Sequence, residues 1–126
     1  MIFLILFGLN GCKAKNEPGC HEILRIENKL DIDMYYIWGN CDGGLPSYNF
    51  MGQKSALLKS KSQVKDYNLG GFEKDFRYCP SLTLLFVDAK LLDIPYDTIR
   101  KNDMVLYRRS YTLEQLDSLN WIVTVP

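Results

Sequence analysis

The sequence is poor in the residues that most catalytic and metal sites require. Its 126 residues include one histidine, His21, and its four cysteines form no Cys-x-x-Cys pair of the kind that binds zinc. We therefore expect no bound metal and no cofactor. The 15 basic and 15 acidic residues cancel, and no block of the chain carries a single sign of charge. A nucleic-acid partner, which needs a basic surface, is not expected.

Alanine is scarce, and a long apolar run is missing. Eight tyrosines and six phenylalanines outnumber the three alanines, a balance that favours strands over helices. The apolar run at residues 2–9 is too short for a membrane-spanning helix, which needs about 20 residues. Its length is instead typical of the hydrophobic part of a secretory signal.

The end of that run resembles the lipobox of a bacterial lipoprotein, because Leu9, Asn10 and Gly11 lead directly into Cys12. Two features depart from the usual signal. No lysine or arginine precedes Ile2, and Asn10 stands where a small aliphatic residue, serine or threonine is more common. The alternative is a buried N-terminal strand with Cys12 as a core thiol. We expect cleavage before Cys12 and acylation of this residue.

This interpretation divides the chain into three parts. Residues 1–11 form a signal peptide, residues 12–19 a lipidated tether, and residues 20–126 a single globular domain. The mature chain of 126 − 11 = 115 residues is long enough for one hydrophobic core. Because two or more acyl chains hold a protein stably on a bilayer, the expected partner is a bacterial membrane and the expected location is the cell envelope.

The remaining cysteines predict one disulfide in an exported protein. Cys20, Cys41 and Cys79 allow three pairings. If residues 22–28 and 32–39 form a hairpin, Cys20 lies opposite Cys41, which makes this pair the first expectation. The alternative is a Cys41–Cys79 bridge.

Several segments have the pattern of β-strands. Two of them, at residues 32–38 and 82–88, are apolar on both faces, which indicates strands that are central or covered. Short strands without regular long helices between them predict an antiparallel β-sandwich, immunoglobulin-like, with one or two short helices. The expected strands cover residues 22–28, 32–38, 56–58, 63–67, 82–88, 104–109 and 121–125.

The clearest helix signal is a capping box at Thr112 and Gln115. The threonine hydroxyl accepts a hydrogen bond from the amide three residues on, and the glutamine side chain reaches back to the threonine amide. Single helical turns are also expected at residues 72–76 and 96–100.

Two groups of residues are candidates for a binding surface. Tyr35, Tyr48 and Phe50, with Tyr36 and Trp38, form a candidate aromatic platform for sugar rings or a protein partner. The alternative places Tyr36 and Trp38 in the core.

The second candidate surface is basic and includes Arg100 and Lys101, with Arg108 and Arg109 further along. Acidic partners and lipid head groups are its expected ligands. Neighbouring strand residues point to opposite faces, so Arg108 and Arg109 do not reinforce each other. The alternative is a solvated edge that prevents strand addition.

Candidates for catalysis are weak. His21 follows Cys20 directly, and adjacent residues of a strand cannot easily share a proton because they face opposite ways. Asp31 and Asp33 are spaced as a carboxylate pair but also fit a solvated turn. We therefore expect no enzymatic activity.

Parts of the chain resemble a family of small uncharacterised lipoproteins from Bacteroidetes. The resemblance covers about half of the mature chain and rests on residues 26–36 and on residues 97–102 (DTIRKN), 105–106 (VL), 111–116 (YTLEQL) and 119–121 (LNW). It implies one β-rich domain on a lipid tether and carries no catalytic residue. Surface export in that phylum tends to follow an acidic cluster after the lipidated cysteine. Residues 13–17 lack such a cluster, which favours the periplasmic face of the outer membrane.

The expected function is therefore that of a lipid-anchored, non-enzymatic binding or structural module. Its expected partner is an envelope protein or glycan. The alternative is an immunity or inhibitor protein that neutralises a toxin or hydrolase at the envelope.

Overall fold

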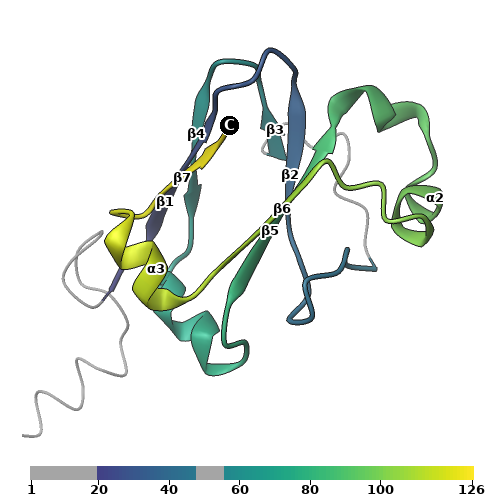
Figure 1. The fold of residues 1–126 in the computed structure, drawn as a ribbon. Helices are drawn as coiled ribbons and strands as arrows, with labels where there is room; N and C mark the ends of the chain where they lie inside the picture. The colour runs from purple at the N-terminus through teal and green to yellow at the C-terminus, as the bar shows by residue number, and fades with distance from the viewer. Residues whose placement is uncertain (1–19, 48–55) are drawn as a thin grey trace, which may run out of the picture.

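Two β-sheets make up most of the protein (Figure 1). A computed structural model describes residues 20–47 and 56–126. The first sheet has the strand order β4-β1-β7 and the second the order β3-β2-β5-β6. The strands are β1 (Ile23–Asn28), β2 (Met34–Trp38), β3 (Leu57–Leu58), β4 (Gln63–Tyr67), β5 (Leu82–Asp88), β6 (Tyr107–Tyr111) and β7 (Ile122–Val125). The predicted two-sheet, mainly β sandwich is confirmed, and its immunoglobulin-like refinement stays a prediction.

Four short helices connect the strands of the described residues. They are the 3-10 helices η2 (Phe72–Arg77) and η3 (Ala89–Asp93) and the α-helices α2 (Tyr96–Lys101) and α3 (Leu113–Ser118). The capping box predicted at the start of α3 is present, with Thr112 and Gln115 bonded reciprocally. Strand β6 begins at Tyr107, three residues later than predicted. Met104 and Val105 pack instead against the hydrophobic cluster that contains Ile99 of α2.

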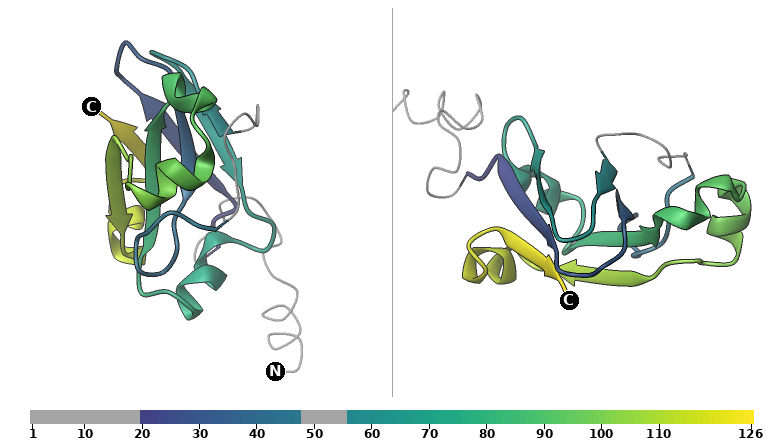
Figure 2. Two further views of the ribbon diagram at one scale, coloured as in Figure 1. Left: turned by 90° about the vertical axis from the view of Figure 1, so that its right-hand side faces the viewer. Right: turned by 90° about the horizontal axis from the view of Figure 1, so that it is seen from above.

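The main core lies between the two sheets. Strand β1 alternates buried and more exposed residues, as a strand with one solvated face should. Its inward residues, Leu24 and Ile26, are fully buried and pack with residues such as Phe86 of β5 and Val123 of β7. The views in Figure 2 show the sheets as two layers inclined to each other.

A second, smaller core covers the other face of the four-stranded sheet. Leu85 and Val87 of β5 and Ile37 of β2 point to this side, where Ile99 of α2 packs on them. Strands β2 and β5 are therefore buried on both faces, as their uninterrupted apolar sequences predict.

Strands β1 and β2 do not form the hairpin that the sequence suggests. They lie in different sheets, with β1 between β4 and β7 and β2 between β3 and β5. Strand β1 has one apolar face, whereas β2 is apolar on both faces. Strand β1 therefore suits a sheet with one face in solvent, and β2 suits a sheet that is covered on both faces. Residues 29–33 carry the chain from one sheet to the other.

A buried asparagine fixes this crossing. Asn28 is 1% exposed, and its Nδ2 donates hydrogen bonds to the carbonyl oxygens of Ile32 (2.8 Å), Leu58 (3.3 Å) and Lys59 (3.2 Å). Its Oδ1 accepts a bond from the Leu30 amide at 2.9 Å. One side chain thus satisfies buried backbone groups in two turns that come from different parts of the chain.

Cys41 and Cys79 form a disulfide that links positions 38 residues apart. The predicted Cys20–Cys41 pairing is therefore wrong, and the alternative is confirmed. The first expectation depended on a β1–β2 hairpin, which would have placed Cys20 beside Cys41. Because the two strands lie in separate sheets, that register does not exist.

Candidate functional site

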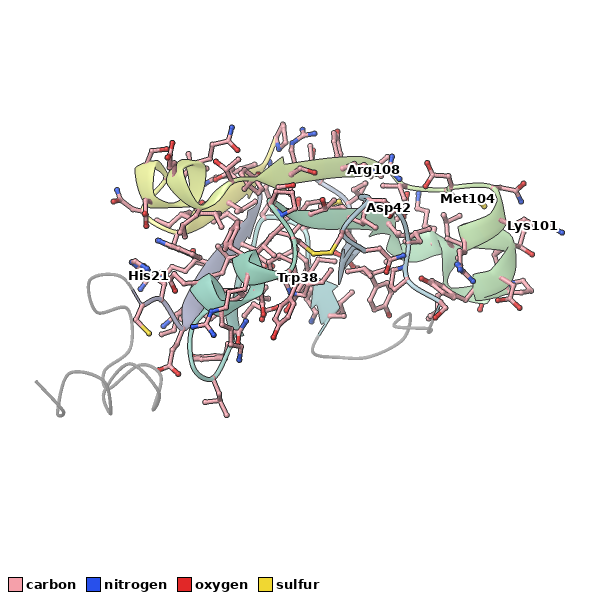
Figure 3. The ribbon with its side chains drawn as sticks, turned by 90° about the horizontal axis from the view of Figure 1, so that it is seen from below. His21, Trp38, Asp42, Lys101, Met104 and Arg108 are labelled. Carbon is pink, nitrogen blue, oxygen red and sulfur yellow. A yellow bond between two sulfur atoms is a disulfide. The ribbon has the colours of Figure 1, made fainter. Side chains whose placement is uncertain are left out.

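A groove lies beside the disulfide, where β2 ends and β5 begins. It encloses about 240 Å³. Strand β2 contributes Trp38, helix η2 contributes Asp75, and Tyr78 and Ser81 lie between η2 and β5. Ligand sites typically combine an apolar wall with a few polar groups, and this groove has that composition. Figure 3 shows the position of Trp38 among the side chains.

A cross-sheet hydrogen bond holds the indole of the groove. Trp38 Nε1 donates to Oδ2 of Asp66 on β4 at 3.0 Å. Burial, and then the charge and hydrogen bond of Asp66, raises the pKa of Tyr36 well above its ordinary value. The phenol of Tyr36 is thus a second hydrogen-bond donor to the same carboxylate. Asp66 positions the aromatic wall of the groove without being part of it.

Tyr78 is the most accessible aromatic residue of the groove. Its side chain is 83% exposed. Its backbone is nevertheless fixed, because its amide donates to the Asp75 carbonyl at 3.1 Å and its neighbour Cys79 is bonded to Cys41. An exposed ring on a fixed backbone is available to stack on a ligand at a small entropic cost.

His21 belongs to a separate cluster at the start of β1. Its Nδ1 lies 2.5 Å from Oε2 of Glu73, and its amide donates to Oε1 of the same carboxylate at 2.7 Å. The imidazole stacks on Trp121 with ring centroids 4.4 Å apart, and Trp121 in turn contacts Phe72 at 5.8 Å. These contacts tie η2, β1 and the start of β7 together.

The His21–Glu73 pair resembles the carboxylate–imidazole half of a catalytic triad, but a triad also needs a nucleophile. In the described part of the chain, no hydroxyl or thiol is hydrogen-bonded to this imidazole. Its face is covered by Trp121, and its side chain is 18% exposed. The geometry therefore supports a packing role for the pair.

Trp121 reaches the cluster through an unusual backbone. Asn120 and Trp121 both have positive φ, at 54° and 58°. The left-handed region is uncommon for residues other than glycine and strained for bulky ones. The Trp121 amide donates to the Leu116 carbonyl at 3.0 Å, a hydrogen bond that closes the C-terminal end of α3. The indole Nε1 of Trp121 donates to Asp117 at 2.9 Å.

The predicted aromatic platform is not assembled as the sequence suggested. Tyr35 is 6% exposed and Tyr36 is 8% exposed, so both rings belong to the interior. Tyr48 and Phe50 lie outside the described residues. Among the predicted aromatic residues that the structure describes, Trp38 lines the groove beside the disulfide, and Tyr35 and Tyr36 do not.

The predicted basic residues are spread apart. Arg100 and Lys101 are exposed in the last turn of α2. Arg108 bridges other elements, since it donates to the Gly43 carbonyl at 2.9 Å and pairs with Asp103 at 2.6 Å. Arg109 lies over the Tyr107 ring on the opposite face of β6.

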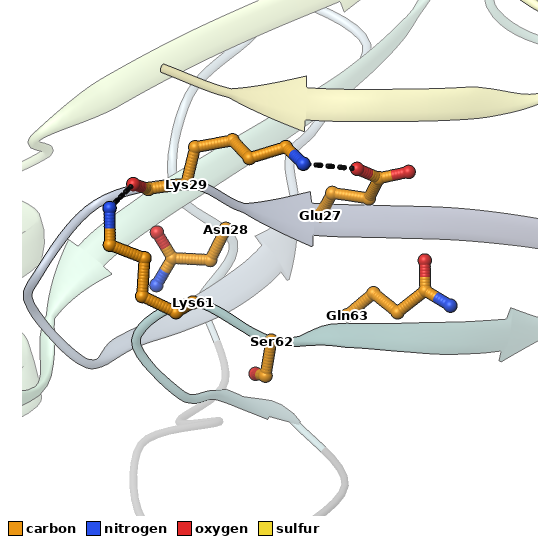
Figure 4. Close-up of a pocket in the computed structure, with 6 residues that line it drawn as sticks. All are labelled: Glu27, Asn28, Lys29, Lys61, Ser62 and Gln63. Atoms are coloured by element: carbon orange, nitrogen blue, oxygen red, sulfur yellow. Dashed lines mark hydrogen bonds and ion pairs between the residues drawn. The ribbon is translucent and has the colours of Figure 1, made fainter.

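The turn residues Asp31 and Asp33 do not form a carboxylate pair. Asp33 Oδ1 accepts from the Ser60 amide at 2.8 Å, and Asp31 lies 3.4 Å from Lys61. Figure 4 shows a hollow beside this turn, whose charged side chains bind other groups of the same hollow. Lys29 forms an ion pair with Glu27 at 3.2 Å, and Lys61 donates a hydrogen bond to the Lys29 carbonyl at 2.6 Å. The hollow offers a ligand little uncompensated charge.

Across residues 20–47 and 56–126, no group of three or more His, Cys, Asp or Glu side chains is placed to hold a metal ion. In the same residues, no helix has both the length and the apolar character needed to cross a bilayer.

No family model, curated protein or solved structure matches the chain. Function is therefore argued from the site itself, since a fold class by itself implies no activity.

Three residues of the groove and the histidine cluster were not identified from the sequence. Asp66 shares a strand face with Val64, so the alternation of residues 63–67 already indicated an inward carboxylate. Tyr78 precedes Cys79, and the correct disulfide would have placed it beside Trp38. Glu73 carried no signal, because its bond to His21 spans 52 residues.

Proposed function

We propose that the protein is a lipid-anchored domain of the bacterial cell envelope. The observation that carries this proposal is the apolar run at residues 2–9, which ends in Leu9, Asn10, Gly11 and Cys12. Support comes from the disulfide between Cys41 and Cys79, since disulfides persist in oxidising compartments. The residues that the structure describes begin at Cys20, eight positions after Cys12, and we propose that residues 13–19 serve as a spacer.

The anchor is tested by replacing Cys12 with serine. We expect the parent protein to take up an alkyne-tagged fatty acid in living cells and to remain in the membrane fraction. The Cys12→Ser variant should take up none and leave the membrane fraction. Cys20→Ser is the matched control and should still be labelled. Equal labelling of the parent and Cys12→Ser proteins, or a parent protein recovered unlabelled from the cytosol, would contradict the anchor.

We further infer that the domain binds a ligand through the groove beside the disulfide and catalyses no reaction. Trp38 and Tyr78 supply aromatic surface, and Asp75 and Ser81 supply polar atoms. A pyranose ring has an apolar C–H face that can stack on the aromatic side chains and hydroxyl groups that can bond to the polar atoms. The volume of about 240 Å³ is below the range typical of drug-sized ligands, which suits one sugar ring at a time. An envelope glycan is therefore the ligand class that we propose.

Binding is tested by titrating the purified full chain with chitotriose, cellotriose and maltotriose and following tryptophan fluorescence. We expect one of these sugars to change the emission of Trp38. Tyr78→Ala should weaken binding about fivefold, since one aromatic stacking contact is worth about 1 kcal/mol. Tyr67→Ala is a matched control, because Tyr67 is 56% exposed and does not line the groove. If no sugar binds the folded protein, the glycan assignment fails.

A further inference from the structure

The turn between β4 and η2 presents an exposed leucine. Leu69 is 85% exposed, the highest value among the large apolar residues of the described chain. Tyr67, two residues earlier, is 56% exposed. Leu69 belongs to neither hydrophobic core and presents most of its apolar side chain to solvent.

This turn lies against the point where the N-terminal spacer enters the domain. The Gly70 amide donates to Oε2 of Glu22 at 2.9 Å, and the Asn68 amide donates to the Glu22 carbonyl at 2.9 Å. Sγ of Cys20 lies 3.8 Å from the Gly70 carbonyl oxygen. Leu69 therefore sits in the same end of the molecule as the first described residue.

The spacer is short. Eight residue steps separate Cys12 from Cys20, so the chain between them can span at most about 29 Å. If Cys12 carries the acyl chains, the end of the domain that contains Cys20 and Leu69 is held within this distance of the lipid surface.

Exposed cationic side chains lie near the turn. Arg25 and Lys65 lie opposite each other on the solvated face of the β4-β1-β7 sheet. Lys74 is exposed on η2, and its Nζ donates to the Leu69 carbonyl, which holds this charge beside the leucine. The neighbouring carboxylates accept hydrogen bonds within the protein. Glu73 binds His21, and Asp66 binds Trp38 on the inner face of its strand. Glu22 accepts from the Gly70 amide, and Asp75 accepts from the Asn68 side chain.

We propose that the turn at residues 67–71 docks on a bilayer that contains anionic phospholipid. Leu69 enters the interface between head groups and acyl chains, with Lys65 and Lys74 at the level of the phosphates. This proposal rests on the proposed lipid anchor, because the anchor brings the turn to the membrane. Docking would give the domain one orientation on its tether and leave the far end of the sheets directed away from the lipid.

The proposal is tested with the full, acylated chain in vesicles of phosphatidylcholine and phosphatidylglycerol that contain brominated acyl chains. Bromine quenches tryptophan fluorescence only on close approach. Leu69→Trp places a reporter in the turn. Leu92→Trp is the matched control, because Leu92 is 46% exposed on η3, which follows the far end of β5 (Figure 1). The signal of Trp38 and Trp121 is measured in the parent protein and subtracted.

We expect brominated lipid to reduce the reporter emission at least twofold for Leu69→Trp and by less than a tenth for Leu92→Trp. Lys65→Glu combined with Lys74→Glu should at least halve the quenching of the Leu69→Trp reporter. Equal quenching at the two positions, or none at either, overturns the docking while the protein still floats with the vesicles. A protein that carries no acyl chain and does not float shows instead that the anchor is wrong.

Discussion

Replacing Trp121 by alanine lowers the free energy of unfolding by about 3–5 kcal/mol, the range for removing a large buried aromatic side chain. Trp121 is 3% exposed, stacks on His21 and contacts Phe72. Its indole also donates to Asp117. The loss therefore combines a cavity with the release of η2 and β1 from the start of β7.

Urea unfolding followed by far-ultraviolet circular dichroism measures this effect. Trp121→Phe keeps an aromatic ring and should recover at least half of the loss, whereas Leu119→Ala, at a residue that is 43% exposed, should change stability by less than about 0.5 kcal/mol. A Trp121→Ala variant as stable as the Leu119→Ala control would show that the stacked cluster does not hold η2 and β1 to the start of β7.

Removing the disulfide with Cys41→Ser and Cys79→Ser together costs about 3–4 kcal/mol, because the bond closes a loop of 38 positions and restricts the unfolded chain. The bond also fixes one wall of the groove, since Cys79 lies between Tyr78 and the start of β5. We therefore expect the double variant to lose sugar affinity as well as stability.

The same urea experiment checks this prediction with and without a reducing agent. When reduced, the parent protein should unfold at a lower urea concentration than when oxidised, by at least the difference between the oxidised parent and the oxidised double variant. If reduction leaves the unfolding midpoint of the parent unchanged, the bridge contributes nothing to stability. If both proteins bind sugar equally, the bridge does not shape the groove.

The parts of the fold that could be predicted are those set by local pattern. The sequence of strand β5 is apolar on both faces, and the strand lies between two cores. Helix α3 begins at the predicted Thr112–Gln115 capping box. In these segments the period of the sequence and its cap residues agree with the final packing.

Pairing between strands could not be predicted from proximity in the sequence. The turn residues after β1 suggested a hairpin with β2, but each strand found its partners far along the chain, with β7 parallel to β1. Asn28 looked like a turn residue, and only the folded chain shows its buried amide bonded to three carbonyls. Because the disulfide assignment rested on the hairpin, that error carried over to it.

The candidate site was predictable only in fragments. Trp38 was recognised as a possible binding aromatic, but its alternation with Tyr35 on β2 places the two rings on opposite faces of the sheet. Tyr78 became visible only with the Cys41–Cys79 bond, which brings residues from β2 and from beyond η2 to one place. Sites assembled from distant segments leave no short motif in a sequence.

The parallel pairing of β1 with β7 has a consequence for biogenesis. The first sheet is complete only when Ile122–Val125 reach β1, whose Arg25 amide binds the Trp121 carbonyl at 3.0 Å. Contacts this distant in sequence form late. A nascent chain emerging from the ribosome therefore cannot close its domain early. For a protein that we propose is threaded through a narrow translocation channel, this delay keeps the polypeptide open until its passage is nearly finished.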